Sequence, residues 1–125
     1  MSIGIVGSRD FNDYALFRAK IAEWEQRHGM IISIVSGGAQ GADDMARRLA
    51  NERGIPITVY PPKWKSWDEE KGVFVNDKTA ALKRNTLIVD ASEAIIAFPT
   101  KSSRGTRDTI RKARERGKPV TIYEV

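Results

Sequence analysis

Short apolar runs alternate with stretches of helical periodicity along most of the chain. After the apolar run at 2–7, apolar residues recur at steps of three and four between Tyr14 and Trp24, which is the spacing of one helix face. The same order, a short apolar run and then a periodic stretch, recurs to the end of the sequence. The pattern predicts strands at 2–7, 31–35, 57–60, 94–98 and 120–123 and helices at 14–27, 41–52, 77–90 and 105–116.

Strands that alternate with helices are typical of a parallel sheet with right-handed crossovers and helices on both faces. We therefore expect an α/β, Rossmann-like three-layer sandwich. Its five-stranded parallel sheet should have the order 3-2-1-4-5, counting the predicted strands along the chain. A length of 125 residues, 41% of them hydrophobic, suits a single domain over 1–125 with one core.

One segment, 61–76, does not fit the alternation. Two prolines end the third predicted strand, and the following residues mix charges with Trp64, Trp67 and Phe74. A loop of this length usually acts as a lid or binding loop. Its tryptophans would either stack on a base or pack in the core or the lid. An exposed aromatic loop would also suit the interface of a homo-oligomer.

The composition excludes several kinds of catalytic and metal site. The chain has no cysteine, and His28 is its single histidine, so it lacks the residues for thiol catalysis, a disulfide or a multi-histidine metal site. We expect no metal, no cofactor and a solvated His28 near the end of its helix. No apolar run reaches membrane-spanning length and no leader pattern precedes the first strand. We therefore expect a cytoplasmic protein without a membrane partner.

The net charge of +5 comes from 21 Lys and Arg against 16 Asp and Glu, and part of the excess lies between Arg104 and Lys118. This run is either a nucleic-acid face, whose affinity would fall with salt, or a solvated helix flank with cations near its C-terminal end.

Three glycine- and serine-rich turns follow the first, second and fourth predicted strands. They lie at 7–9, 36–43 and 102–106, each where a helix should begin. In a doubly wound sheet the carboxyl ends of these strands meet at the switch point, where ligands bind. Free N–H groups and the positive end of a helix attract anions there. Because turns far apart in the sequence meet at one crevice, together they predict a nucleotide site.

The turns also carry a family resemblance. The first continues as Gly7-Ser8-Arg9-Asp10-Phe11, the second reads Ser36-Gly37-Gly38-Ala39-Gln40-Gly41-Ala42-Asp43, and Arg84-Asn85 precedes Ser103-x-Gly105-Thr106. Over nearly its whole length the chain resembles the YspA/YpsA-related branch of the SLOG superfamily. That superfamily of Rossmann-like nucleotide-binding proteins includes the lonely guy phosphoribohydrolases and the DNA-processing protein DprA.

The resemblance implies an activity. Lonely guy enzymes hydrolyse the N-glycosidic bond of a nucleoside 5′-monophosphate with an arginine before the fourth strand and a glutamate after the glycine–threonine turn. Arg84 matches the arginine, whereas Thr109 stands at the position of the glutamate, with Asp108 one residue earlier. A carboxylate stabilises an oxocarbenium-like state and threonine cannot. We therefore take Asp43, part of the YspA-related signature, as the candidate acid.

Each candidate residue has a second interpretation. The glycines would let a phosphate approach the backbone, or would only supply turns with positive φ. Arg9 would bind a phosphate through two hydrogen bonds, or form an ion pair with Asp10 or Asp43. Thr106 would contact ligand, or cap the helix. We expect catalytic roles for Arg84 and Asp43, and ligand-binding roles for Gly7, Ser8, Arg9, Phe11, Ser36, Gly37, Gly38, Ala39, Gly41, Ala42, Asn85, Ser103, Gly105 and Thr106.

Three functions follow as alternatives. The first is binding of a nucleotide or nucleotide-derived ligand with hydrolysis of its N-glycosidic bond. The second is nucleotide sensing without turnover. The third is DprA-like binding of single-stranded DNA, for which the basic last helix is the independent support. The resemblance also implies a homo-oligomer.

Overall fold

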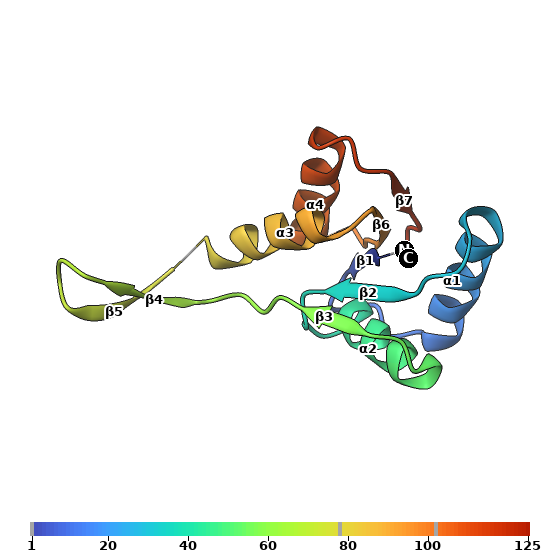
Figure 1. The fold of residues 1–125 in the computed structure, drawn as a ribbon, viewed down its shortest axis with the longest axis horizontal. Coiled ribbons are helices and arrows are strands. Elements are labelled where there is room, and N and C mark those ends of the chain that lie inside the picture. Colours follow the sequence, from blue (N-terminus) through green and yellow to red (C-terminus); the bar gives the residue numbers. More distant parts are fainter. Residues whose placement is uncertain (1, 78, 102) are drawn as a thin grey trace.

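A five-stranded parallel sheet forms the centre of the computed structural model, which describes residues 2–77, 79–101 and 103–125. Its strands are β1 (Ser2–Gly7), β2 (Ser33–Ser36), β3 (Ile57–Val59), β6 (Ala94–Phe98) and β7 (Val120–Ile122). They lie in the order β3-β2-β1-β6-β7 (Figure 1). Since β6 and β7 are the fourth and fifth predicted strands, this order and the Rossmann-like fold are confirmed.

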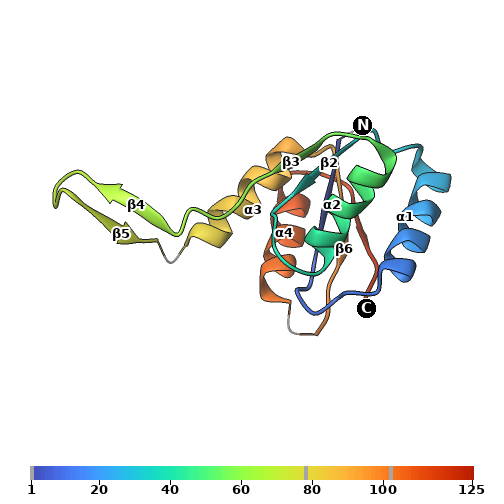
Figure 2. The ribbon, with the colours of Figure 1, turned by 90° about the horizontal axis from the view of Figure 1, so that it is seen from below.

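Two pairs of helices cover the sheet, one pair on each face (Figure 2). They are α1 (Tyr14–His28), α2 (Ala42–Arg53), α3 (Ala80–Ala91) and α4 (Arg104–Glu115). Ile3 and Ile5 of β1 pack under α1 and α2, whereas Val6 packs under α3 and α4. This alternation follows from the two-residue period of a strand, whose successive side chains point to opposite faces. The apolar run of β1 thus serves both layers of the core.

The segment 61–76, expected to be a loop, instead contains an antiparallel hairpin of β4 (Lys65–Asp68) and β5 (Val73–Asn76). Trp67 pairs directly with Phe74, and the Asp68 carboxylate accepts the backbone N–H groups of Glu70 and Lys71 in the turn. We call residues 65–76 the arm, because Figures 1 and 2 both show it projecting away from the rest of the molecule.

The aromatic residues in and beside the arm are exposed, which corrects the expectation that they pack in the core. Trp64, which directly precedes the arm, and Trp67 and Phe74 within it are 50%, 54% and 67% exposed, so their side chains do not pack in the core. Among the helices of the described residues, none is both long and apolar enough to cross a membrane.

Candidate functional site

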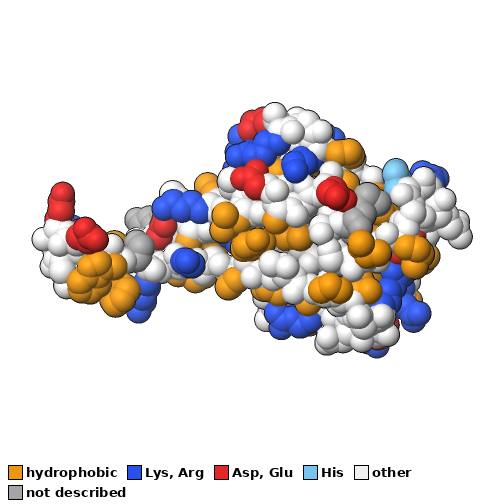
Figure 3. Space-filling view, viewed as in Figure 1, with side chains coloured by type: hydrophobic (Ala, Val, Ile, Leu, Met, Phe, Trp, Pro, Cys, Tyr) orange, Lys and Arg blue, Asp and Glu red, His pale blue; other side chains and the backbone are white. Residues whose placement is uncertain are grey.

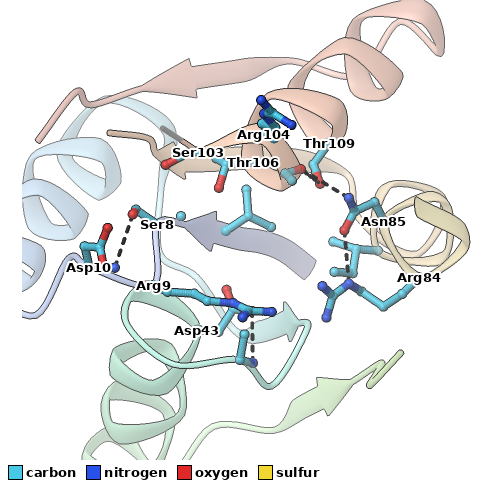
Figure 4. A pocket seen from close by; sticks show the side chains of 15 residues that line it. Ser8, Arg9, Asp10, Asp43, Arg84, Asn85, Ser103, Arg104, Thr106 and Thr109 are labelled. Carbon is cyan, nitrogen blue, oxygen red and sulfur yellow. Dashed lines mark hydrogen bonds between the residues drawn. The ribbon is translucent and has the colours of Figure 1, made fainter. Parts of the chain in front are cut away.

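A cavity of about 380 Å³ opens at the carboxyl ends of β1 and β6, between the starts of α2 and α4 and the side of α3 (Figure 4). Most of the predicted site residues meet there, although they come from widely separated parts of the chain. The predicted residues that line the cavity are Gly7, Ser8, Arg9, Ala39, Asp43, Arg84, Asn85, Ser103, Gly105 and Thr106. Ser102, part of the third turn, lies outside the described residues.

The other predicted residues do not line the cavity. Phe11 is buried in the core, where its ring stacks on Phe98 with centroids 5.3 Å apart. Ser36, Gly37, Gly38, Gly41 and Ala42 shape the turns without lining the cavity. Gly41 has φ +74°, and a β-carbon there would collide with the Ser8 carbonyl oxygen. Its conformation and its close contact therefore both require glycine.

Sequence reasoning missed several lining residues: Val6, Asp10, Ile88, Arg104 and Thr109. Asp10 directly follows the first predicted turn and Arg104 lies within the third, so their positions along the sequence could have indicated them. Val6 and Ile88 carry only the apolar pattern of a strand and a helix, which marks core residues and gives no sign of a cavity. Thr109 lines the cavity at the position where the resemblance places a glutamate, but it contributes no charge.

Asp43 is the buried carboxyl group of the site. It lies in the first turn of α2, and its Oδ2 accepts the backbone N–H of Ala39 at 3.2 Å. Burial raises the pKa of Asp43 to about 6, against the opposing effects of that hydrogen bond and of Arg84 and Arg9. A carboxyl group with this pKa exists in both protonation states near neutral pH, which suits acid–base chemistry.

Arg84 connects α3 to the second turn. Its Nη1 donates to the Gly37 carbonyl at 2.9 Å, and its Nε donates to Asn85 Oδ1 at 3.0 Å. Burial, together with the charge of Arg9, lowers the pKa of Arg84, while Asp43 opposes that change. The guanidinium is therefore held beside the Asp43 carboxyl group and fixed in orientation by two acceptors.

Asp108, the second carboxylate considered from the sequence, is engaged elsewhere. Arg111 and Lys112 contact it at 2.7 and 2.8 Å, and Asn85 Nδ2 donates to it at 3.2 Å. Although burial alone would raise the pKa of Asp108, these hydrogen bonds lower it. Asp108 is not among the residues that line the cavity; its ion pairs lie within α4, and its hydrogen bond with Asn85 links α4 to α3.

Hydroxyl groups gather where the third turn meets the first. Thr100 Oγ1 donates to Ser8 Oγ at 3.1 Å, and the Thr100 N–H donates to Ser103 Oγ at 2.8 Å. Within the described residues, the Ser103 side chain makes no capping hydrogen bond to the first turn of α4. Helix N-termini without such a cap leave N–H groups available to an anion. In the described ranges no cluster of three acidic, histidine or cysteine residues could hold a metal ion.

Residues 1–67 match the model of the YspA, cpYpsA-related SLOG family. The chain belongs to this family. The match covers the first two turns and ends before α3, so Arg84 and the third turn lie outside it. The chain is also 33% identical to the Gene 61 protein of Mycobacterium phage D29, over 95% of this chain and 93% of that protein.

Solved structures share the fold. The DNA processing protein A of Streptococcus pneumoniae aligns with a TM-score of 0.71 and 20% identity over 97% of this chain, which spans 49% of that protein. The Helicobacter pylori protein of the same name, described with a single-stranded DNA binding mode, gives 0.69 and 22% over 98% of this chain. This chain spans 64% of it. At these identities the likeness shows the fold alone.

The pKa of Asp43 predicts a pH-dependent stability. The pKa of about 6 in the folded protein exceeds the ordinary value of 3.8, so the contribution of the protonated Asp43 carboxyl group to stability is fully present below about pH 4 and is lost as pH rises through 6. Asp43→Asn should therefore become more stable than the wild type by up to roughly 3 kcal/mol at pH 8, with a difference that shrinks at pH 4. Urea denaturation across this range measures the effect. The control is Asp44→Asn, an exposed carboxylate in the same turn, and a difference for Asp43→Asn that stays constant with pH would contradict the assignment.

Gly37 should be required for the position of Arg84. A β-carbon at Gly37 would lie 2.9 Å from the Arg84 guanidinium carbon and 2.9 Å from Asp43 Oδ2, so Gly37→Ala should displace Arg84 and shift its Nε–H resonance in NMR spectra. Gly105 lines the same cavity, but a β-carbon there meets nothing within 4 Å. Gly105→Ala should leave that resonance in place and stabilise α4 by about 0.5–1 kcal/mol. Equal spectra for Gly37→Ala and the wild type would refute the packing argument.

Proposed function

We propose that the cavity binds a nucleotide or nucleotide-derived ligand and hydrolyses its N-glycosidic bond. One observation carries the proposal: turns from three separate parts of the chain line a single cavity that also contains Asp43 and Arg84. Such a site needs backbone N–H groups that bind an anion, and an acid whose pKa lies near the working pH.

The phosphate group would bind at the start of α4. Ser103, Gly105 and Thr106 line the cavity at this helix N-terminus, and the Ser8 hydroxyl lies near Ser103 because both form hydrogen bonds with the Thr100 hydroxyl. Arg9 and Arg104 line the same cavity, and their guanidinium groups suit bidentate contact with phosphate oxygens. The sugar would then extend toward Asp43, Arg84 and Asn85.

Asp43 would supply the acid–base function. In the reaction, the bond between the anomeric carbon and the base nitrogen breaks, water adds to that carbon, and the water proton goes to the base. The products are a free base and ribose 5-phosphate. A carboxyl group with a pKa of about 6 can protonate the base or, once ionised, stabilise the oxocarbenium-like state. Arg84 would orient the sugar and hold the Asp43 carboxyl group in place.

The test is incubation with a panel of nucleoside 5′-monophosphates, followed by chromatography for free base and thermal-shift measurement on the same samples. Arg84→Ala should weaken ligand binding by about tenfold to a hundredfold, because hydrogen bonds to a charged group are lost. Asp43→Asn should bind ligand but lower the rate of base release by about a hundredfold or more. Lys83→Ala, an exposed neighbour on the same helix, is the matched control.

The outcomes separate the alternatives. A thermal shift without free base would leave a nucleotide sensor, a function consistent with Thr109 in place of a glutamate and with Asp108 bound to Arg111 and Lys112. The absence of both shift and product with every nucleotide would reject the proposal.

Single-stranded DNA is the second candidate ligand. Arginines on one face of α4 favour it, as does the DNA-binding description of the Helicobacter pylori neighbour. If DNA binds there, fluorescence anisotropy of a labelled strand should show an affinity that falls steeply with salt, and Arg107→Glu with Arg114→Glu should weaken binding. An affinity that is equal at about 50 and 200 mM salt would exclude this mode.

A further inference from the structure

The arm leaves an aromatic face uncovered. Trp67 and Phe74 pair edge to face with ring centroids 5.1 Å apart, and both are more than half exposed. Apart from their pairing with each other, neither β4 nor β5 packs extensively on a helix or strand within the described residues. A two-stranded hairpin without further packing is at best marginally stable in water. A partner that covers this aromatic face would stabilise the hairpin.

The charge of the arm narrows the choice of partner. Its tip, residues 68–72, contains Asp68, Glu69 and Glu70 with a single cation, Lys71, whereas Lys65 lies at the other end of the arm. Figure 3 shows acidic side chains at the end of the arm, beside an apolar surface. An acidic tip repels nucleic acid and is attracted to a basic protein surface.

The same chain presents such a surface on α4. Arg104, Arg107, Arg111 and Arg114 follow one another at steps of three and four, are exposed and share one helix face. We call these residues the arginine stripe; Figure 3 shows cations gathered over this helix. Arg111 pairs with Asp108 and Glu115, whereas no carboxylate among the described residues forms an ion pair with the other members of the stripe. The stripe begins at the cavity, which Arg104 lines.

We propose that the arm of one copy lies along the arginine stripe of a second copy. The arm of the same copy projects away from α4 (Figures 1 and 2), so the contact is between copies, and a two-fold axis would let both arms engage. The lengths agree: the arm extends roughly 20 Å at about 3.3 Å per residue, and the stripe covers about 15 Å of helix. The acidic tip would lie against Arg107 and Arg114, with Trp67 and Phe74 nearer Arg104.

This arrangement would also complete the cavity. No aromatic side chain is among the residues that line it in the described part of the chain, yet a flat base is commonly held by an aromatic face. The partner's Trp67 and the partner's Phe74 would supply that face at the cavity mouth. This part of the inference rests on the proposed nucleotide function, whereas the contact between copies does not.

Charge reversal tests the contact directly. Sedimentation velocity should show a dimer for the wild type. Glu69→Lys with Glu70→Lys, and separately Arg107→Glu with Arg114→Glu, should each raise the dissociation constant by more than about tenfold. An equimolar mixture of the two variants should recover the dimer, because each arm then meets a stripe of opposite charge. Met30→Ala with Ile32→Ala, which removes exposed apolar residues elsewhere, should leave the dimer intact.

A wild type that stays monomeric, or a mixture that does not recover the dimer, would overturn the proposal. So would a monomer whose stripe binds single-stranded DNA. Circular dichroism of each variant verifies that it is folded.

Ligand binding tests the composite cavity. Trp67→Ala with Phe74→Ala should weaken nucleotide binding by about tenfold or more. Mixing this variant with Arg84→Ala should restore wild-type affinity in a fraction of sites, because one intact cavity then receives one intact arm. No recovery on mixing would overturn the composite cavity. If the wild type dimerises as predicted but binds no nucleotide, the proposed function fails while the arm contact stands.

Discussion

The close approach between the end of β1 and the start of α2 is the constraint on which the site depends. A β-carbon at Gly7 would lie 2.5 Å from the Ala42 β-carbon and 2.9 Å from the Phe98 carbonyl oxygen. A β-carbon at Gly41 would collide with the Ser8 carbonyl oxygen, which accepts the Ala42 N–H at 3.4 Å. Only glycine allows the two backbones to come this close. Their contact sets α2 against β1 and thereby aims Asp43 into the cavity.

From this junction the other parts of the site follow. Asp43 is buried because α2 begins against β1 and β2, and burial is the main cause of its raised pKa. Arg84 reaches the same point from α3 and is held by the Gly37 carbonyl. The position of Asp43 therefore depends on the turn after β1, and the position of Arg84 depends on the turn after β2. Sites built in this way hold their charged groups rigidly, which reduces the reorganisation that a reaction or a binding event requires.

The fold could be predicted because its signals are local and repeated. The alternation of apolar strands with periodic helices specifies a parallel sheet, and the turns after β1, β2 and β6 specify where a cavity opens. The arm was missed because each of its strands has only four residues and β4 has a single apolar one, Trp67, although Gly72 with φ +63° marks its turn. The position of Phe11 could not be predicted either, since its burial depends on Phe98 from the far side of the sequence. The pKa of Asp43 likewise arises from tertiary burial, which no local pattern encodes.

The most direct measurement of the central claim is backbone amide NMR during titration with the nucleoside monophosphate that stabilises the protein most. If the three turns form one ligand site, the amide signals of Ser8, Ala39 and Thr106 should move together, with a single dissociation constant. Signals that move in one turn only, or that move in the arm while the turns stay unchanged, would contradict the account.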